Sequence, residues 1–271
     1  MKYICDNDLH IHSKLSICSN DEEQTTERIL AYAEESGLKT VCIADHFWDE
    51  NVDGVPDWYQ PQDFKYISLS KPLPQSENVR FLFGCETELK SDMTLGISRE
   101  RFDEFDFVVI PTTHFHFDFV VPNQKDADVN ERAKLWVERF ESVLNMDLPF
   151  HKIGIAHLTT YGIVISSREK FINVLNLLEG KDLKRLFTKA AEKGCGIEIN
   201  AFDMKFSEEE SESILRIYRI AKQCGCKFYF GSDAHHPKDL DDAKALFEKA
   251  IELLELKEED KFQIVKEMVQ K

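Results

Sequence analysis

The sequence predicts an α/β fold made of repeated helix–strand units. Three segments, residues 33–46, 191–202 and 221–235, share one pattern: the end of an amphipathic helix, a glycine, a short β-rich run and a polar tip. Runs such as the FVVI of residues 107–110 are apolar throughout, which is typical of parallel strands covered by helices on both faces. A chain of 271 residues can form a single barrel of such units, so we expect one domain over residues 1–271.

Seven short strands are expected along the chain. They lie within or at the end of residues 8–12, 33–46, 79–88, 106–116, 152–157, 191–202 and 221–235. In three of these segments the preceding helix ends at a glycine, Gly37, Gly194 or Gly225, where we expect a left-handed C-terminal cap.

Helices are expected between and after the strands. Residues 25–36 carry apolar side chains at helical spacing, and residues 240–254 and 259–270 indicate two closing helices. Two candidate capping boxes mark further helix starts: Ser166 with Glu169, and Ser207 with Glu210. Residues 47–78 differ, because they contain four prolines and little periodicity. A connection of that length is more often a functional loop or lid than a simple link.

Composition excludes several classes of protein. The net charge of −16 argues against a non-specific nucleic-acid surface, which needs a basic stripe. The opening residues MKYICDNDLH lack the apolar core of a signal peptide, and no apolar run approaches the roughly 18 residues of a membrane span. Seven cysteines without a C-x-x-C pair fit a reducing compartment. We therefore expect a cytoplasmic protein with no membrane partner, and nucleic acid is an unlikely partner.

The histidines gather at the expected strand ends. In a strand, residues two apart point to the same face, so His10 and His12 should lie side by side. Eight of the nine histidines fall at or just beyond such an end, and only His151 does not. Active sites of β/α barrels form at the C-terminal ends of the strands. One histidine there would be an ordinary polar residue, but eight together predict a metal centre.

The donor chemistry indicates which ions such a centre would bind. Imidazole mixed with carboxylate suits zinc, iron or manganese, whereas a set of oxygen donors would suit magnesium or calcium. The donors exceed what one ion can use, so we expect two or three ions that share a bridging carboxylate, either Glu86 or Asp233, and we count both as catalytic. Closely spaced ions lower the pKa of a trapped water and neutralise charge on attacking and leaving oxygens. This machinery suits hydrolysis of a phosphate ester.

The sequence resembles the PHP (polymerase and histidinol phosphatase) family over nearly its full length. The matching motifs are DLHIHS with His10 and His12, ADH with His46, GCETE with Glu86, TTH with His114, IAH with His157, EIN with Glu198 and Asn200, and GSDAH with Asp233 and His235. The resemblance implies a distorted (β/α)7 TIM-like barrel with a trinuclear metal site.

The resemblance also implies a role for each donor. One ion would be held by His10, His12, Glu86 and Asp233, a second by Glu86, His114 and His157, and the third by His46 and His235.

Cys18 departs from the pattern, because it stands where the family usually supplies a further His or Asp to the third ion. A thiolate binds zinc well, but a loop cysteine beside a weaker third site is the alternative, and both stay open. Asp8, Asp45 and His116 have no assigned ligand role, and one or more of them could orient the imidazoles.

Two cations are candidates for binding the substrate phosphate. Lys205, in NAFDMK, stands where the histidinol-phosphatase branch has an arginine, and lysine meets phosphate as a point charge without the bidentate fork. Arg168 is the second candidate, with a surface salt bridge as the alternative. Several aromatic residues follow the strand ends and could either wall a pocket for a ring-bearing leaving group or pack the 47–78 loop: Phe47, Trp48, Trp58, Tyr59, Phe115, Phe117 and Phe202.

These observations predict a metal-dependent phosphoesterase. We expect it to hydrolyse a small soluble phosphomonoester, similar to histidinol phosphate, with a metal-bound hydroxide at a di- or trinuclear site. The alternatives are a phosphodiesterase, nuclease or nucleotide phosphatase of the same fold, and a non-catalytic metal-binding barrel.

Overall fold

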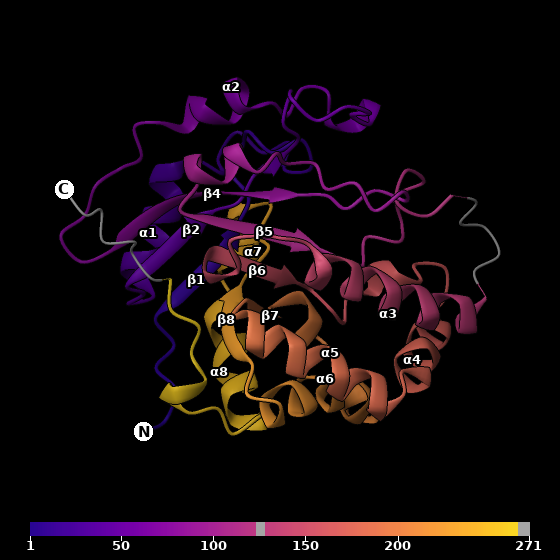
Figure 1. Cartoon of the computed structure of the whole chain (residues 1–271). Coiled ribbons are helices and arrows are strands. Elements are labelled where there is room, and N and C mark those ends of the chain that lie inside the picture. Colours follow the sequence, from indigo (N-terminus) through magenta and orange to yellow (C-terminus); the bar gives the residue numbers. More distant parts are fainter. Residues whose placement is uncertain (123–127, 265–271) are drawn as a thin grey trace.

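Seven parallel strands form a nearly closed barrel surrounded by helices (Figure 1). The structure is a computed structural model that describes residues 1–122 and 128–264. Neighbouring strands run in the order β1 (Asn7–Ile11), β2 (Thr40–Ile43), β4 (Arg80–Thr87), β5 (Phe107–Pro111), β6 (Ile153–Ala156), β7 (Gly196–Asn200) and β8 (Lys227–Gly231). The two-residue strand β3 (His46–Phe47) pairs with the end of β4. The expected α/β barrel of seven strands is confirmed.

The first and last strands meet at their C-terminal ends, next to the site. A parallel bridge joins Ile11 to Ala234. The backbone N–H of Asp233 donates to the carbonyl of His10 at 2.7 Å, and the N–H of His12 donates to the carbonyl of Ala234 at 3.0 Å. This closure fixes the residues after β8 against the residues at the end of β1.

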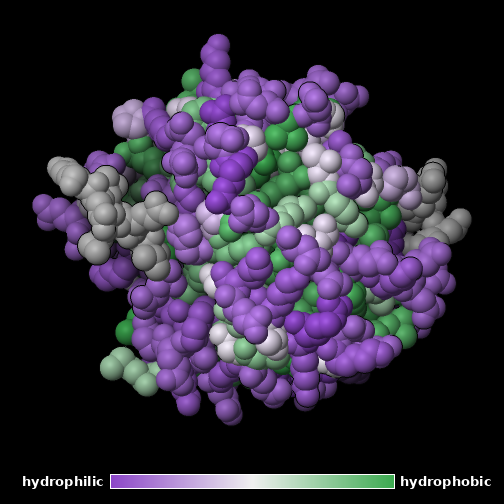
Figure 2. Space-filling view, in the orientation of Figure 1, coloured by the Kyte–Doolittle hydropathy of each residue, from purple (hydrophilic) through white to green (hydrophobic). Residues whose placement is uncertain are grey.

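The helices cover the outside of the barrel. They are α1 (Thr26–Glu35), α2 (Phe64–Ile67), α3 (Val129–Asn145), α4 (Arg168–Leu177), α5 (Gly180–Lys193), α6 (Ser211–Gln223), α7 (Pro237–Leu240) and α8 (Ala243–Leu253). Helices α3 to α6 pack against one another on one side of the strands (Figure 1). Hydrophilic residues cover most of the face shown in Figure 2. In the described part of the chain, no helix is both long enough and apolar enough to span a membrane.

The expected helix ends agree with the structure in most places. Gly37, Gly194 and Gly225 have φ of 69°, 79° and 85°, the left-handed conformation that ends a helix and that glycine adopts without steric cost. The Ser207–Glu210 capping box is present. At α4, however, the cap is Ser167 rather than Ser166, because the Ser167 side chain accepts the N–H of Lys170.

The closing helix expected over residues 259–270 is wrong in its described part. A single 3-10 turn (Glu258–Asp260) is followed by non-helical chain to residue 264, and residues 265–271 lie outside the described residues. The reason is tertiary packing. Phe262 donates its N–H to the carbonyl of Phe228 at 2.8 Å, and its ring contacts Phe107 and Tyr229. These contacts hold the segment in a non-helical conformation that places Phe262 in an apolar cluster with residues of the strands.

The barrel contains two different groups of buried residues. One is an apolar cluster that includes Phe262: Leu9, Cys42, Ala44, Leu82, Phe107, Val109, Ala156, Tyr229 and Phe262. The other, at the polar end formed by the C-terminal ends of the strands, consists of the histidines and carboxylates. The 47–78 segment lies beside this polar end, contains α2 and a 3-10 turn (Asp57–Tyr59), and buries Tyr59 completely.

Candidate metal centre

The two histidines of the opening strand lie side by side, as their spacing predicts. His10 is in β1 and His12 follows its last residue, and both side chains are buried. Their Nε2 atoms are 3.3 Å apart. Two nitrogens that close, both facing carboxylates rather than water, match a pair of ligands aimed at a common cation.

Glu86, near the end of β4, lies at the centre of the donors. Its Oε1 is 3.2 Å from His157 Nε2 and 3.8 Å from His114 Nε2. Its Oε2 faces three further imidazoles: His46 Nδ1 at 3.1 Å, His12 Nε2 at 3.5 Å and His10 Nε2 at 3.6 Å. Each oxygen therefore faces a different set of histidines, so the carboxylate is accessible to both groups of imidazoles.

The residues after β8 complete the group. Asp233 Oδ1 is 3.1 Å from His12 Nε2 and 3.5 Å from His10 Nε2. The ring of His235 lies 4.5 Å from the ring of His12, measured between centroids. Asp233 and His157 have φ of 54° and 28°, which is uncommon outside glycine and clusters at functional sites. The structure thus brings all eight expected ligand residues together.

Three sets of ligand atoms lie close enough to hold an ion. They are His10 with His12 and Glu86, Glu86 with His114 and His157, and His12 with Cys18 and His235. Within each set the ligand atoms are within 4.8 Å of one another. The first set contains three of the four residues expected at the first ion, without Asp233, and the second set has the same residues as those expected at the second ion. In the third, His235 groups with His12 and Cys18, whereas His46 belongs to none of the three sets.

The donor set fits transition-metal ions. The imidazole nitrogens and carboxylate oxygens are buried and face one another at 3.1–3.8 Å. Imidazole with carboxylate suits zinc, manganese or iron, and a shared carboxylate suits ions held close together. The low pKa of Glu86 also favours a cation site. Although burial would raise the pKa of Glu86, His46 and His10 hold it well below its ordinary value.

Other residues orient the imidazoles, and these were not expected from the sequence. His10 Nδ1 donates to Glu198 Oε1 at 2.7 Å, and His114 Nδ1 donates to Glu88 Oε2 at 2.6 Å. Each bond leaves Nε2 as the free nitrogen and raises its basicity, the usual device in metal sites. Gly231 makes room for the first pair, because a Cβ there would lie 2.0 Å from Glu198 Oε1. The available signal was that Glu88 follows Glu86 by two residues and Glu198 lies in the EIN motif.

Three residues were considered for an orienting role: Asp8, Asp45 and His116. Asp8 accepts hydrogen bonds from Tyr32 and from the Ser232 N–H, and Asp45 accepts two from Ser13. His116 Nδ1 is buried without a hydrogen-bond partner among the described residues.

The two candidate phosphate-binding cations lie outside this donor group. Lys205 is exposed, and its Nζ is 4.7 Å from the ring centroid of Phe202. Arg168 is half-buried, and its Nε and Nη2 donate to the two carboxylate oxygens of Glu210 at 2.7 and 3.0 Å. The guanidinium fork of Arg168 already has an anion, whereas the ammonium of Lys205 rests on an aromatic face.

Six of the seven aromatic residues form two groups, and Phe202 is exposed. Phe47, Trp48, Tyr59 and Phe115 are buried and belong to packing. Trp58 and Phe117 are half-buried and lie 4.9 Å apart between ring centroids. Trp58 is 4.7 Å from the ring of His46, and Phe117 is 5.4 Å from the ring of His114. These two rings border His46 and His114, two of the candidate metal ligands.

Comparison with known proteins gives a family match and two similar folds. Residues 8–202 match the family model of the PHP domain. The fold is similar to the crystal structure of histidinol phosphate phosphatase from Lactococcus lactis complexed with zinc, L-histidinol and phosphate, with 18% identity, a TM-score of 0.61, and 91% of this chain and 94% of that chain covered. It is also similar to a candidate histidinol phosphatase from Listeria monocytogenes, with 13% identity, a TM-score of 0.62, and coverage of 89% and 100%.

A search of curated proteins finds no relative of this chain. The family match and the clustered histidines and carboxylates support a metal-dependent phosphoesterase.

Proposed function

The chain belongs to the PHP domain family, and on that premise we propose that it is a metal-dependent phosphomonoesterase acting on a small soluble substrate similar to histidinol phosphate. Its cofactors would be two or three divalent ions of zinc, manganese or iron. The observation that carries this proposal is the position of Glu86, whose two oxygens face separate histidine groups. A carboxylate in that position can hold two cations at the spacing that phosphate hydrolysis uses.

Bound ions would supply a water of lowered pKa and would neutralise charge on the phosphate oxygens. The chain's own residues fix that chemistry in place. Glu86 balances charge between the two histidine groups. Asp233 is held from both sides, since Oδ1 contacts His12 and Oδ2 accepts a hydrogen bond from Asn200 at 3.4 Å. We assign both carboxylates to the catalytic group because they contact the metal-ligand nitrogens directly.

We propose Lys205 as the cation that meets the substrate phosphate. It follows β7 by five residues, and its partner in the structure is the face of Phe202 rather than a carboxylate. A cation on a ring is held by about 0.5–1 kcal/mol at an exposed site, so an arriving phosphate can compete for it. Arg168 stays the second candidate, but a phosphate must displace Glu210 to reach it.

The substrate class follows from the same surroundings. Trp58 and Phe117 present ring faces and edges next to His46 and His114, and a ring-bearing leaving group would stack there favourably. The Lactococcus lactis protein of the same fold was solved with L-histidinol, which carries an imidazole ring, and with phosphate. Both observations support histidinol phosphate as the first compound to test.

A panel of phosphate esters tests the proposal. Purified protein supplied with zinc or manganese should release phosphate from histidinol phosphate faster than from nucleoside monophosphates, and much faster than it cleaves bis-p-nitrophenyl phosphate. Chelated protein should be inactive and should recover when metal is returned. Faster cleavage of the diester would instead assign a phosphodiesterase or nuclease. Metal-replete protein that hydrolyses none of these esters would overturn the proposal in favour of a non-catalytic metal-binding barrel.

A further inference from the structure

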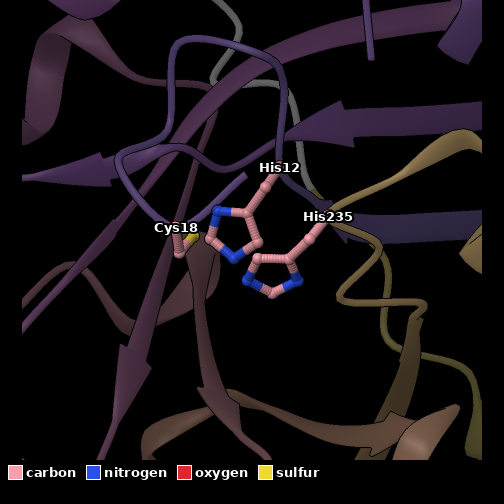
Figure 3. Close-up of side chains that lie close together, drawn as sticks. All are labelled: His12, Cys18 and His235. Carbon is pink, nitrogen blue, oxygen red and sulfur yellow. The ribbon is translucent and has the colours of Figure 1, made fainter. Parts of the chain in front are cut away.

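A sulfur–nitrogen donor group adjoins the histidine–carboxylate centre. It consists of Cys18, His12 and His235, whose ligand atoms lie within 4.8 Å of one another. Figure 3 shows the two imidazole rings next to each other and the sulfur of Cys18 directed toward the ring of His12. His12 also belongs to the group with His10 and Glu86, so the two groups are adjacent and have this residue in common.

From this geometry, and resting on the proposed function, we propose that Cys18 binds a zinc ion as a thiolate, with His235 as its imidazole partner. When the ion binds, the thiol S–H bond breaks, a Zn–S bond forms, and the proton passes to water. Zn–S and Zn–N bonds of about 2.3 and 2.0–2.1 Å place tetrahedral donors roughly 3.3–3.6 Å apart. Side-chain rotations would bring the sulfur and the His235 nitrogen to that spacing, while His12 stays with His10 and Glu86.

The hydrogen bonds of His235 prepare it for this role. Its Nδ1 lies 2.6 Å from the carbonyl oxygen of Asp233. A carbonyl can only accept, so Nδ1 carries the proton and Nε2 keeps the free lone pair. A ligand histidine is usually fixed in this way by a backbone carbonyl or carboxylate.

The loop that carries Cys18 is anchored on both sides of the sulfur. Ser16 Oγ lies 3.0 Å from His12 Nδ1 and 3.4 Å from Cys18 Sγ. Ser19 Oγ donates to the carbonyl of His235 at 2.6 Å. The sulfur is therefore held beside both imidazoles by the residues that flank it, rather than lying on a free loop.

Sulfur gives this group a metal preference that the other two donor groups lack. Those groups offer only imidazole nitrogen and carboxylate oxygen, which zinc, manganese and iron all accept. A thiolate favours zinc over manganese. We therefore expect one ion of the centre to remain zinc when the protein is prepared in manganese with trace zinc present.

Cobalt substitution tests the sulfur ligand directly. Wild-type protein loaded with Co²⁺ should show a near-ultraviolet thiolate-to-cobalt charge-transfer band, and Cys18→Ser should lose it. Cys224→Ser is the matched control, because Cys224 is half-buried at the end of α6, outside the donor groups, and this variant should keep the band. A fully loaded wild type without the band, or a Cys18→Ser variant that retains it, overturns the proposal.

Zinc content gives a second measurement that does not depend on colour. After equilibration with zinc and desalting, Cys18→Ser should retain one zinc equivalent fewer than wild type, and Cys18→Asp, which restores an anionic ligand, should recover it at least in part. X-ray absorption of the wild-type zinc protein should show sulfur at about 2.3 Å. If Cys18→Ser does not fold, the X-ray absorption spectra of the wild-type and Cys18→Asp zinc proteins are compared instead, and the sulfur signal should be present only in wild type. A wild-type spectrum with zinc but no zinc–sulfur scattering would contradict the proposal.

The outcomes separate this inference from the proposed function. Hydrolysis of histidinol phosphate by a protein without zinc–sulfur scattering would leave the function standing and remove the Cys18 ligand. Zinc–sulfur scattering in a protein that hydrolyses no phosphate ester would do the reverse.

Discussion

The candidate metal-ligand histidines and the two candidate phosphate-binding cations differ in how the structure holds them. Histidines such as His10 and His114 are buried at strand ends, and each has a carboxylate, Glu198 or Glu88, that fixes its ring. Lys205 follows β7 by five residues and is exposed, whereas Arg168 is the first residue of α4 and is paired to Glu210.

This difference indicates that the histidine–carboxylate group is preorganised and that the two cations are not. A buried donor with its own orienting partner cannot relax when the substrate is absent, so its loss should remove both metal and activity. A cation at the edge can be replaced or re-paired with only a change in substrate binding. The predictions below test this contrast, in order of expected effect.

The largest effect is expected from Glu86→Gln. The amide keeps the shape of the side chain but removes the negative charge that would hold two cations together. We expect loss of at least one ion and nearly all turnover, while the fold survives, as measured by metal analysis, kcat and circular dichroism. Glu252→Gln, at an exposed carboxylate paired with Lys2, is the control and should match wild type. Full metal content with normal kcat in Glu86→Gln would show that the bridge lies elsewhere.

Removing an orienting charge should have the next largest effect. In Glu198→Gln, the ring of His10 loses the carboxylate that accepts from Nδ1, so His10 becomes a poorer ligand. Metal affinity or activity should fall about 10–100-fold, measured by competition with a chelator and by kcat. Glu88→Gln tests the same point at His114. Unchanged metal affinity in both variants would mean that burial alone fixes these rings.

Lys205→Ala should affect the substrate and not the metal. Loss of a charge-assisted hydrogen bond to phosphate, roughly 1.5–3 kcal/mol, corresponds to about a ten- to hundredfold fall in kcat/KM. The loss should be mainly in KM, with metal content equal to wild type. Lys205→Arg should retain activity because it restores a guanidinium fork, and Lys134→Ala, at an exposed lysine on α3, is the neutral control. Unaltered phosphate-ester kinetics in Lys205→Ala would make this lysine a solvated surface charge.

The smallest effect is expected from Arg168→Ala. Because its fork is bound to Glu210, kcat/KM should change less than about threefold, and the partly exposed ion pair contributes about 0–1 kcal/mol of stability. A large fall in kcat/KM would instead identify Arg168 as the phosphate anchor.

The same pair gives a pH dependence with a defined sign. Arg168 lowers the pKa of Glu210 to about 2 from its ordinary 4.5. A depressed carboxylate pKa stabilises the fold above the unfolded-state value, and that contribution is lost as the pH falls from about 4.5 to about 2. The difference in Tm between metal-free wild type and Arg168→Ala should therefore shrink over this range, and a difference that grows on acidification would contradict the assignment.

The sequence was informative wherever a local rule linked residue type to position. Strand periodicity predicts His10 beside His12, as observed. The position of Gly37, Gly194 and Gly225 after amphipathic helices predicts their left-handed conformation, which the structure shows. The parallel arrangement of strands predicts that distant strand ends meet, which is why the sequence alone predicts one site from the separate motifs of His46, Glu86 and Asp233.

Only the tertiary structure decided which partner each of these side chains and the nearby cations contacts. Glu198 reaches His10 across 188 positions in the chain, and Arg168 reaches Glu210 across 42. No local pattern encodes such pairings, because they depend on how neighbouring strands and loops are registered. The same holds for Phe262. Its segment is predicted as helix from the sequence, but in the structure it is not helical and Phe262 packs in the apolar cluster with Phe107 and Tyr229. Local sequence determined which side chains stand at the strand ends, and packing over long chain separations determined which partner each of them meets.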